Sequence, residues 1–220
     1  MIYRMKFEKH DEVKYIGHLD TMRTFTRCIK RTSLPIKFSK GFNPRVQLSF
    51  ALPLGVGVTS DSEYVDLELE DEVEVVELKK ELNSTLPDGF KIVNVVKSEN
   101  SKSLMSLVKE AIYEIGIEFE NDDDIEELVQ KIENIFAQEV IEVEKQGKNK
   151  KIELVNIKSN ILDIEVEVIG FSSIRVTLHC NAGSENNLNP NLVVDKIKNE
   201  LAGTEIIDFN IHRRELILKD

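Results

Sequence analysis

The sequence predicts an α+β fold made of two tandem ferredoxin-like domains, each a βαββαβ unit with an antiparallel sheet. Apolar and polar residues alternate over short segments in both halves, which is typical of strands with one buried face. Between these segments, apolar residues recur at helical intervals. The order strand, helix, two strands, helix, strand occurs twice, and 220 residues are enough for two small domains.

The first domain is expected to span residues 1–98, with one short strand inserted into the βαββαβ order. Its expected elements are a strand at 2–8, a helix at 18–31, a short strand at 36–39, strands at 45–52 and 63–70, a helix at 73–86 and a strand at 90–96. Leu34-Pro35 ends the first helix, because a residue before proline is pushed out of the helical region. Gly41 in Lys40-Gly41-Phe42-Asn43-Pro44 indicates a tight turn, since glycine adopts positive φ without strain.

The second domain is expected to span residues 104–220, after a polar linker at 99–103. Its expected elements are a segment at 104–119 that ends as a strand, a helix after Asp122-Asp123-Asp124, hairpins at 140–157 and 162–180, a helix at 191–201 and a strand at 206–218. The three aspartates favour a helix start there, because carboxylates are stabilised at the positive end of the helix dipole. No residue-level repeat relates the halves; only the order of elements recurs.

The positive charge of this acidic chain is concentrated at its N-terminal end. The net charge is −11, yet residues 1–50 hold 11 Lys and Arg against four Asp and Glu, and the remaining residues hold 18 against 36. A chain of this charge is not expected to coat nucleic acid indiscriminately. A local site for an anion is expected only near the N-terminus.

Several classes of protein are not expected from this sequence. No apolar run approaches the roughly 20 residues that cross a bilayer, and the N-terminus has no signal-peptide core, which favours a cytoplasmic protein without membrane contact. The two cysteines, Cys28 and Cys180, are too few for a disulfide framework or a thiolate cluster and are expected to be buried free thiols. No P-loop, dinucleotide, nucleophile-elbow or zinc motif is present, so neither a cofactor nor a metal is expected.

The helix at 18–31 is expected to be amphipathic, with a cationic outer face. Its apolar stripe contains Leu19, Met22, Phe25 and Ile29, and its other side holds Arg23, Arg27, Lys30 and Arg31. Asp20 supports Arg23 one turn on, and the following segment adds Lys37, Lys40 and Arg45. Arginine binds phosphate through two parallel hydrogen bonds, so RNA is the expected partner. Ser39, Gly41, Phe42 and Asn43 would shape the pocket.

Other residues near this segment have two interpretations. Phe42 and Tyr15 either stack on bases or pack into the local core. Glu63, Tyr64 and Asp66 are expected to meet the cationic segment, where they either tie the strand to the helix through an ion pair or position an arginine for a ligand. His18 is the one weak catalytic candidate, as a proton shuttle of a metal-independent ribonuclease; its alternative is a partly buried structural histidine.

Three runs in the first half resemble the bacterial radical-SAM-linked family of conserved domains. They are GHLDTMRTF, then R-x-x-L-P-I-x-F-S-K-G-F-N-P, then LSFALPLGVGVTSDSEYVDLEL, in the family's order. Gly17 stands where the family has serine, so no role is assigned to a hydroxyl there. The matching positions are His18, Asp20, Arg23, Ser39, Gly41, Phe42, Asn43, Pro44, Glu63, Tyr64 and Asp66.

The resemblance implies a stand-alone domain that works beside a radical-SAM protein, in a context near ribosomal-protein and ribonuclease genes. The chain lacks the C-x-x-x-C-x-x-C cluster motif, so that chemistry is not expected within it. The layout is also similar to CRISPR repeat-processing endoribonucleases. Three functions are therefore carried forward: a non-enzymatic RNA-binding or RNA-modification accessory protein, a metal-independent endoribonuclease, and a module that docks a radical-SAM partner.

Overall fold

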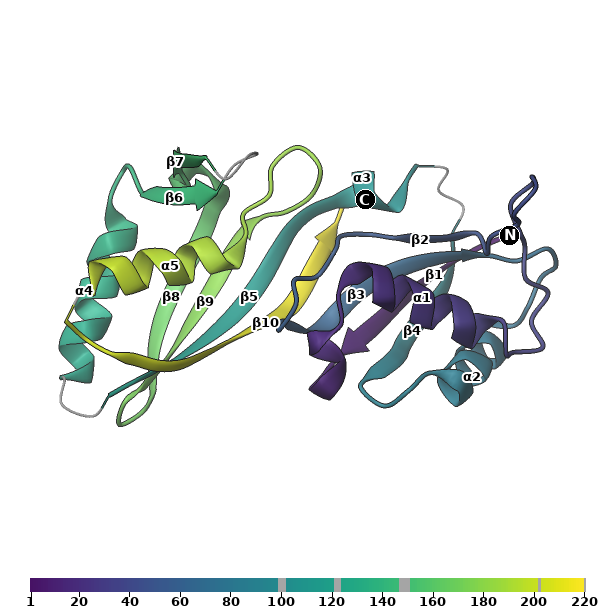
Figure 1. Ribbon diagram of the computed structural model, residues 1–220, viewed down its shortest axis with the longest axis horizontal. Coiled ribbons are helices and arrows are strands. Elements are labelled where there is room, and N and C mark those ends of the chain that lie inside the picture. Colours follow the sequence, from purple (N-terminus) through teal and green to yellow (C-terminus); the bar gives the residue numbers. More distant parts are fainter. Residues whose placement is uncertain (99–101, 121–123, 147–150, 202, 220) are drawn as a thin grey trace. The chain divides into compact units, whose positions relative to one another are not determined.

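The computed structural model describes residues 1–98, 102–120, 124–146, 151–201 and 203–219, which form two compact units (Figure 1). The N-terminal unit comprises Met1–Val108 together with the end of the chain from Glu215 on. The C-terminal unit comprises Lys109–Arg214. The sequence predicted domains at 1–98 and 104–220; the structure instead groups the last residues of the chain with the N-terminal unit.

The N-terminal unit has an antiparallel sheet. Its strands are β1 (Ile2–Lys9), β2 (Leu48–Phe50), β3 (Thr59–Glu68) and β4 (Phe90–Ser98). Their order is β4-β1-β3, and β2 pairs with β3. Met5 of β1 lies opposite Val65 of β3 and Val95 of β4, so buried positions of three strands share one face.

Two helices cover that face. They are α1 (His18–Ile29), which follows the short 3-10 helix η1 (Asp11–Tyr15), and α2 (Val75–Thr85). The ring of Phe25 in α1 lies 4.8 Å from that of Phe7 in β1 and 5.4 Å from that of Phe90 in β4. Leu78 and Leu82 of α2 belong to the same buried cluster. The apolar stripe predicted for the first helix therefore faces the sheet at Phe25 and Ile29, although Leu19 at its start is exposed.

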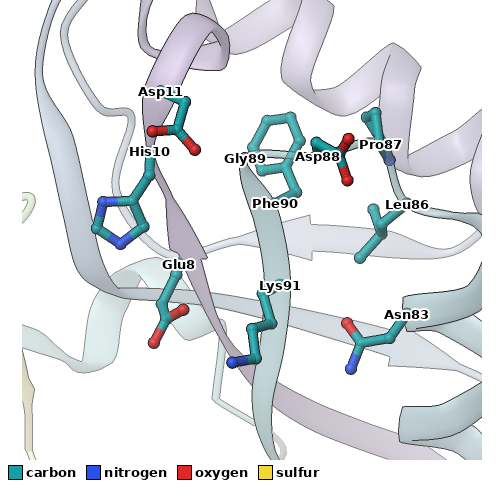
Figure 2. A pocket seen from close by; sticks show the side chains of 10 residues that line it. All are labelled: Glu8, His10, Asp11, Asn83, Leu86, Pro87, Asp88, Gly89, Phe90 and Lys91. Carbon is teal, nitrogen blue, oxygen red and sulfur yellow. The ribbon is translucent and has the colours of Figure 1, made fainter.

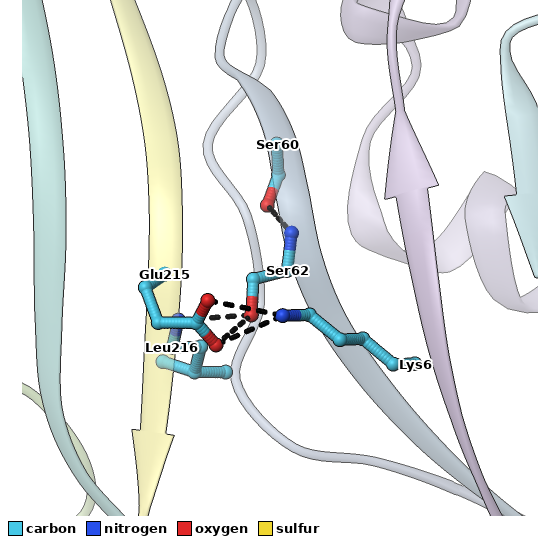
Figure 3. A network of polar contacts seen from close by, with 5 residues as sticks. All are labelled: Lys6, Ser60, Ser62, Glu215 and Leu216. Atoms are coloured by element: carbon cyan, nitrogen blue, oxygen red, sulfur yellow. Dashed lines mark hydrogen bonds and ion pairs between the residues drawn. The ribbon is translucent and has the colours of Figure 1, made fainter. Parts of the chain in front are cut away.

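The end of the chain is held in the N-terminal unit by a polar network (Figure 3). The Ser62 hydroxyl donates to Glu215 at 2.8 Å and accepts the Leu216 amide at 3.1 Å. Lys6 Nζ lies 3.0 Å from both carboxylate oxygens of Glu215. Ser62 is fully buried, so these contacts satisfy a hydroxyl that water does not reach.

The C-terminal unit also combines an antiparallel sheet with helices. Its elements include β5 (Val108–Phe119), α4 (Ile125–Ala137), β6 (Glu142–Gln146), β7 (Ile152–Asn156), β8 (Ile161–Gly170), β9 (Ser173–Asn181), α5 (Pro190–Glu200) and β10 (Ile206–Leu218). The strand order is β10-β5-β9-β8, while β6 and β7 form a separate hairpin. The short helix α3 (Leu104–Leu107) belongs to the N-terminal unit and comes directly before β5 in the sequence. Asp124 caps α4 by accepting the amides of Glu126 and Glu127.

The predicted mixed α+β class with antiparallel sheets is confirmed, and so are the buried free thiols Cys28 and Cys180. The strand expected at 36–39 is wrong, because Ile36 and Phe38 form only isolated bridges, to Leu69 and Val46. The strand expected at 45–52 shortens to β2, and η1 was not expected. Three predicted features lie wholly or partly outside the described residues. They are the linker at 99–103 (in part), Asp122 and Asp123 before the helix, and the turn at 147–150. No described helix is long and apolar enough to cross a membrane.

Candidate nucleic-acid interface

The outer face of α1 carries three exposed cations. Arg23, Arg27 and Lys30 follow one another at i, i+4 and i+7, so they lie along one side of the helix. Buried residues of the opposite side, including Phe25 and Ile29, hold this helix against the sheet. The predicted cationic face is therefore presented to solvent by the packing of the apolar one.

The charges on this face differ in how they are paired. Arg23 pairs with Asp20 at 2.8 Å, and both side chains are more than half exposed. An exposed pair of this kind contributes only about 0–1 kcal/mol, so it exchanges readily for another anion. Among the described residues, Arg27 has no ion-pair partner. The net result is a positive surface in spite of Asp20.

Arg31, at the end of the predicted helix, is bound by other groups of the protein. Its guanidinium donates to the Thr85 carbonyl at the end of α2 and to Cys28 Sγ at 3.3 Å. These bonds tie the end of α1 to α2. Arg31 was predicted to hold phosphate together with Arg27 and Lys30; in the structure its guanidinium instead makes a contact within the protein.

The following segment forms a hairpin at residues 36–47. Phe38 bridges Val46, the Ser39 amide donates to the Arg45 carbonyl at 2.8 Å, and the Arg45 amide donates to the Ser39 hydroxyl at 2.9 Å. Gly41 at the tip has φ +134, which a side chain rarely adopts. Ser39 and Gly41, two of the predicted site residues, therefore shape the turn. Three others, Phe42, Asn43 and Arg45, are exposed on it.

One contact joins α1 to this hairpin. Lys30 Nζ lies 5.9 Å from the centre of the Phe38 ring, within the range of a cation–π interaction. Lys37 is paired with Glu68 at 2.6 Å, whereas Lys40 and Arg45 are exposed without an ion-pair partner among the described residues. We call the cations Arg27, Lys30, Lys40 and Arg45 the basic surface.

Glu63 and Asp66 both lie on β3. Glu63 is buried on β3, opposite Phe7 of β1, on the face that the helices cover. Asp66 accepts two hydrogen bonds of 2.9 Å from Arg4, its neighbour across β1 and β3. Asp66 therefore forms an ion pair, but with an arginine of β1 and not with the helix to which the sequence predicted that it would tie the strand.

His18 opens α1 and packs on an aromatic ring. It is partly buried, and its ring meets the edge of Phe50 with centroids 5.5 Å apart. Burial lowers the pKa of His18 below its usual 6.5, and the charge of the buried Lys9 lowers it further. The imidazole is therefore neutral at pH 7. Asp20 pairs with Arg23, so the structure does not join His18 and Asp20 into an acid–base pair.

A cavity of about 400 Å³ lies elsewhere in this unit, at the end of β1 (Figure 2). Its lining includes three carboxylates, Glu8, Asp11 and Asp88, and one lysine, Lys91. Gly89 also lines it, and a Cβ added there would come within 2.8 Å of the His10 carbonyl. This acidic cavity was not predicted, contains no residue of the basic surface and is unsuited to an anion.

The fold and this surface define a mixed α+β protein with antiparallel sheets and an exposed basic surface in its N-terminal unit. The chain belongs to the DUF2344 family, described as an uncharacterized protein conserved in bacteria, which matches residues 3–190. The match includes every residue of the basic surface. No curated protein matches the chain significantly.

Two solved structures are similar to the chain. A chain in the crystal structure of a Cbf5-Nop10-Gar1 complex matches 99% of this chain with a TM-score of 0.55 and 10% identity. The match covers 50% of that chain, so the present chain spans about half its length, and the likeness shows the fold alone. A crystal structure of an unknown protein from Galdieria sulphuraria matches 96% of this chain and 97% of its own at 16% identity, but its TM-score of 0.28 supports no argument.

Proposed function

We propose that the N-terminal unit binds RNA through the basic surface, and that the protein is a non-enzymatic RNA-binding or RNA-modification accessory factor. The observation that supports this most is a set of exposed cations, Arg27, Lys30, Lys40 and Arg45, that have no ion-pair partner among the described residues of an acidic chain. Exposed aromatic residues accompany them at Phe38 and Phe42. Cations beside exposed rings are typical of surfaces that bind phosphates and bases together.

The electrostatics favour contact with several phosphates along a strand over capture of one small anion. None of the four cations lines the acidic cavity at the end of β1 or the smaller one beside β2, and all four side chains are exposed. A polyanion needs no enclosure, because each contacted phosphate releases counterions and adds to the affinity. Exposed cations on two adjoining elements suit such a ligand.

The salt dependence of RNA binding tests this function. Affinity of the purified protein for a labelled single-stranded RNA is measured by fluorescence anisotropy over a series of salt concentrations. Four phosphate contacts predict a slope of about −3 for the logarithm of the association constant against the logarithm of salt. Affinity that is undetectable at low salt, or that does not change with salt, would contradict the proposal.

We also propose a specific fold, family and cellular location for the protein. We infer that both units are ferredoxin-like domains, because each has its strands in the order fourth, first, third, second. The three motifs quoted under the sequence analysis favour a stand-alone form of the radical-SAM-linked family, with a radical-SAM protein as its second partner. Two buried free thiols favour the reducing cytoplasm.

The ribonuclease function stays a prediction with a direct test. A neutral His18 suits a general base at pH 7. Replacing His18 with alanine should then abolish RNA cleavage while RNA binding persists. Cleavage that is undiminished in His18→Ala would remove this histidine from the chemistry.

A further inference from the structure

Phe42 is fully exposed at the tip of the 36–47 hairpin. Most described phenylalanines of the N-terminal unit lie in or against the core, as Phe7, Phe25 and Phe90 do. A large apolar ring held entirely in water gains nothing for stability. The sequence left open whether Phe42 packs inward, and the structure excludes that interpretation.

The hairpin presents this ring between cations. The pair of bonds between Ser39 and Arg45 closes the turn, and positive φ at Gly41 redirects the chain just before Phe42. Lys40 and Arg45 flank the ring in sequence, and residues 36–47 contain no Asp or Glu. The tip therefore combines an accessible ring with positive charge, and the hairpin itself contributes no acidic residue.

We propose that Phe42 stacks on an unpaired RNA base while Lys40 and Arg45 contact the adjoining phosphates, so that the RNA segment bound here is single-stranded. This inference rests on the proposed function and names its substrate class. A base in an A-form duplex is already stacked, and its deep, narrow major groove excludes side chains. An unpaired base offers a free face to an aromatic ring, whatever its identity.

A protein partner is the other class of macromolecule that an exposed phenylalanine would fit. The local charge favours RNA, because interfaces between proteins are depleted of lysine at their centre whereas Lys40 adjoins Phe42 directly. A matched control exists within the chain. Phe171, in the turn between β8 and β9, is equally exposed, but residues 169–174 contain no charged residue.

The test compares Phe42→Ala with Phe171→Ala, using a fluorescein-labelled single-stranded RNA of about a dozen nucleotides and a duplex of the same length. Phe42→Ala is expected to raise the Kd for the single strand about 5- to 100-fold, without changing the salt dependence. The Kd for the duplex should change by less than about twofold, and Phe171→Ala should change neither. Both rings are exposed, so both variants should fold normally.

Phe42→Trp provides a second, direct readout. The sequence contains no tryptophan, so this substitution introduces the only indole of the chain. Stacking should quench its fluorescence when the single-stranded RNA is added, and an abasic nucleotide at the contacted position should restore it.

The outcomes separate this inference from the function on which it rests. Salt-dependent RNA binding that is equally tight in Phe42→Ala, with unquenched fluorescence in Phe42→Trp, would overturn the stacking contact and leave RNA binding in place. An equal loss for single strand and duplex would also overturn it. If the unaltered protein binds neither RNA, the proposed function fails and this inference fails with it.

Discussion

Lys30 in α1 places its Nζ 5.9 Å from the centre of the Phe38 ring in the 36–47 hairpin. The contact joins the two segments that hold the basic surface, although α1 ends at Ile29 and the hairpin begins only at residue 36. It also uses the positive charge without neutralising it, unlike the Arg23–Asp20 and Lys37–Glu68 ion pairs. The cations that remain for an anionic partner are therefore fewer than the sequence indicated, and they cluster on two adjoining elements.

The aromatic cluster beneath α1 is expected to dominate the stability of the N-terminal unit. Phe25→Ala should lower the free energy of unfolding by about 3–5 kcal/mol, because it leaves a cavity among Phe7, Phe50 and Phe90. Phe42→Ala, at a fully exposed position, should change it by less than about 0.5 kcal/mol. Urea unfolding followed by circular dichroism measures both. Equal losses would show that Phe42 is packed.

Gly89 and Gly57 form a matched pair for the effect of a side chain. Both have positive φ, +88 and +85, but a Cβ at Gly89 would meet the His10 carbonyl at 2.8 Å, whereas Gly57 has nothing within 4 Å. Gly57→Ala should cost about 1–2 kcal/mol from the backbone alone. Gly89→Ala should cost clearly more, since η1 must shift. Thermal unfolding of the two variants compares them, and equal costs would contradict the predicted clash.

Ser62 is expected to control the attachment of the end of the chain. Ser62→Ala removes the acceptor of the Leu216 amide and the donor to Glu215. We expect a loss of about 1–3 kcal/mol, because buried groups are left unsatisfied. Hydrogen exchange at the Leu216 amide should accelerate while exchange at Met5 in β1 stays slow. Unchanged protection of Leu216 would mean that this network does not anchor the strand.

His18 should make stability fall at acid pH. Its pKa is lowered in the folded protein, so the unfolded state binds the proton more readily, and stability is lost as pH falls below about 6.5. His18→Phe should reduce this dependence, since phenylalanine does not titrate and still meets the Phe50 ring. An NMR titration of His18 gives the pKa directly. A midpoint at or above 6.5 would contradict the predicted effect of burial.

The order of elements could be read from the sequence because each strand and helix has one buried face. The alternation that predicted the first strand appears as buried Tyr3, Met5 and Phe7, and the helical spacing that predicted the first helix appears as buried Phe25 and Ile29. The hairpin at 36–47 was harder to define, because its shape depends on single bonds between Ser39 and Arg45 and not on a periodic pattern.

Partners of individual charges depend on tertiary contacts that the sequence does not display. The spacing grouped Arg31 with the cations of the helix, but its guanidinium reaches the Thr85 carbonyl in α2. Likewise, the residues of β10 read as part of the second domain, yet Glu215 binds Ser62 and Lys6 of the first unit. The exposure of Phe42 could be seen only in the structure, because the sequence around a turn does not show whether an apolar side chain is packed or free.

The most direct test of the basic surface is a comparison of two double charge reversals. Arg27→Glu/Lys30→Glu alters the basic surface, whereas Lys80→Glu/Lys91→Glu makes the same change in net charge at exposed positions of α2 and β4. At low salt, Arg27→Glu/Lys30→Glu should weaken binding of single-stranded RNA on the order of tenfold or more and flatten its salt dependence, while the control should bind nearly as the unaltered protein does. Equal weakening in the two variants would show that RNA responds only to net charge, and would contradict a basic surface formed by α1 and the hairpin.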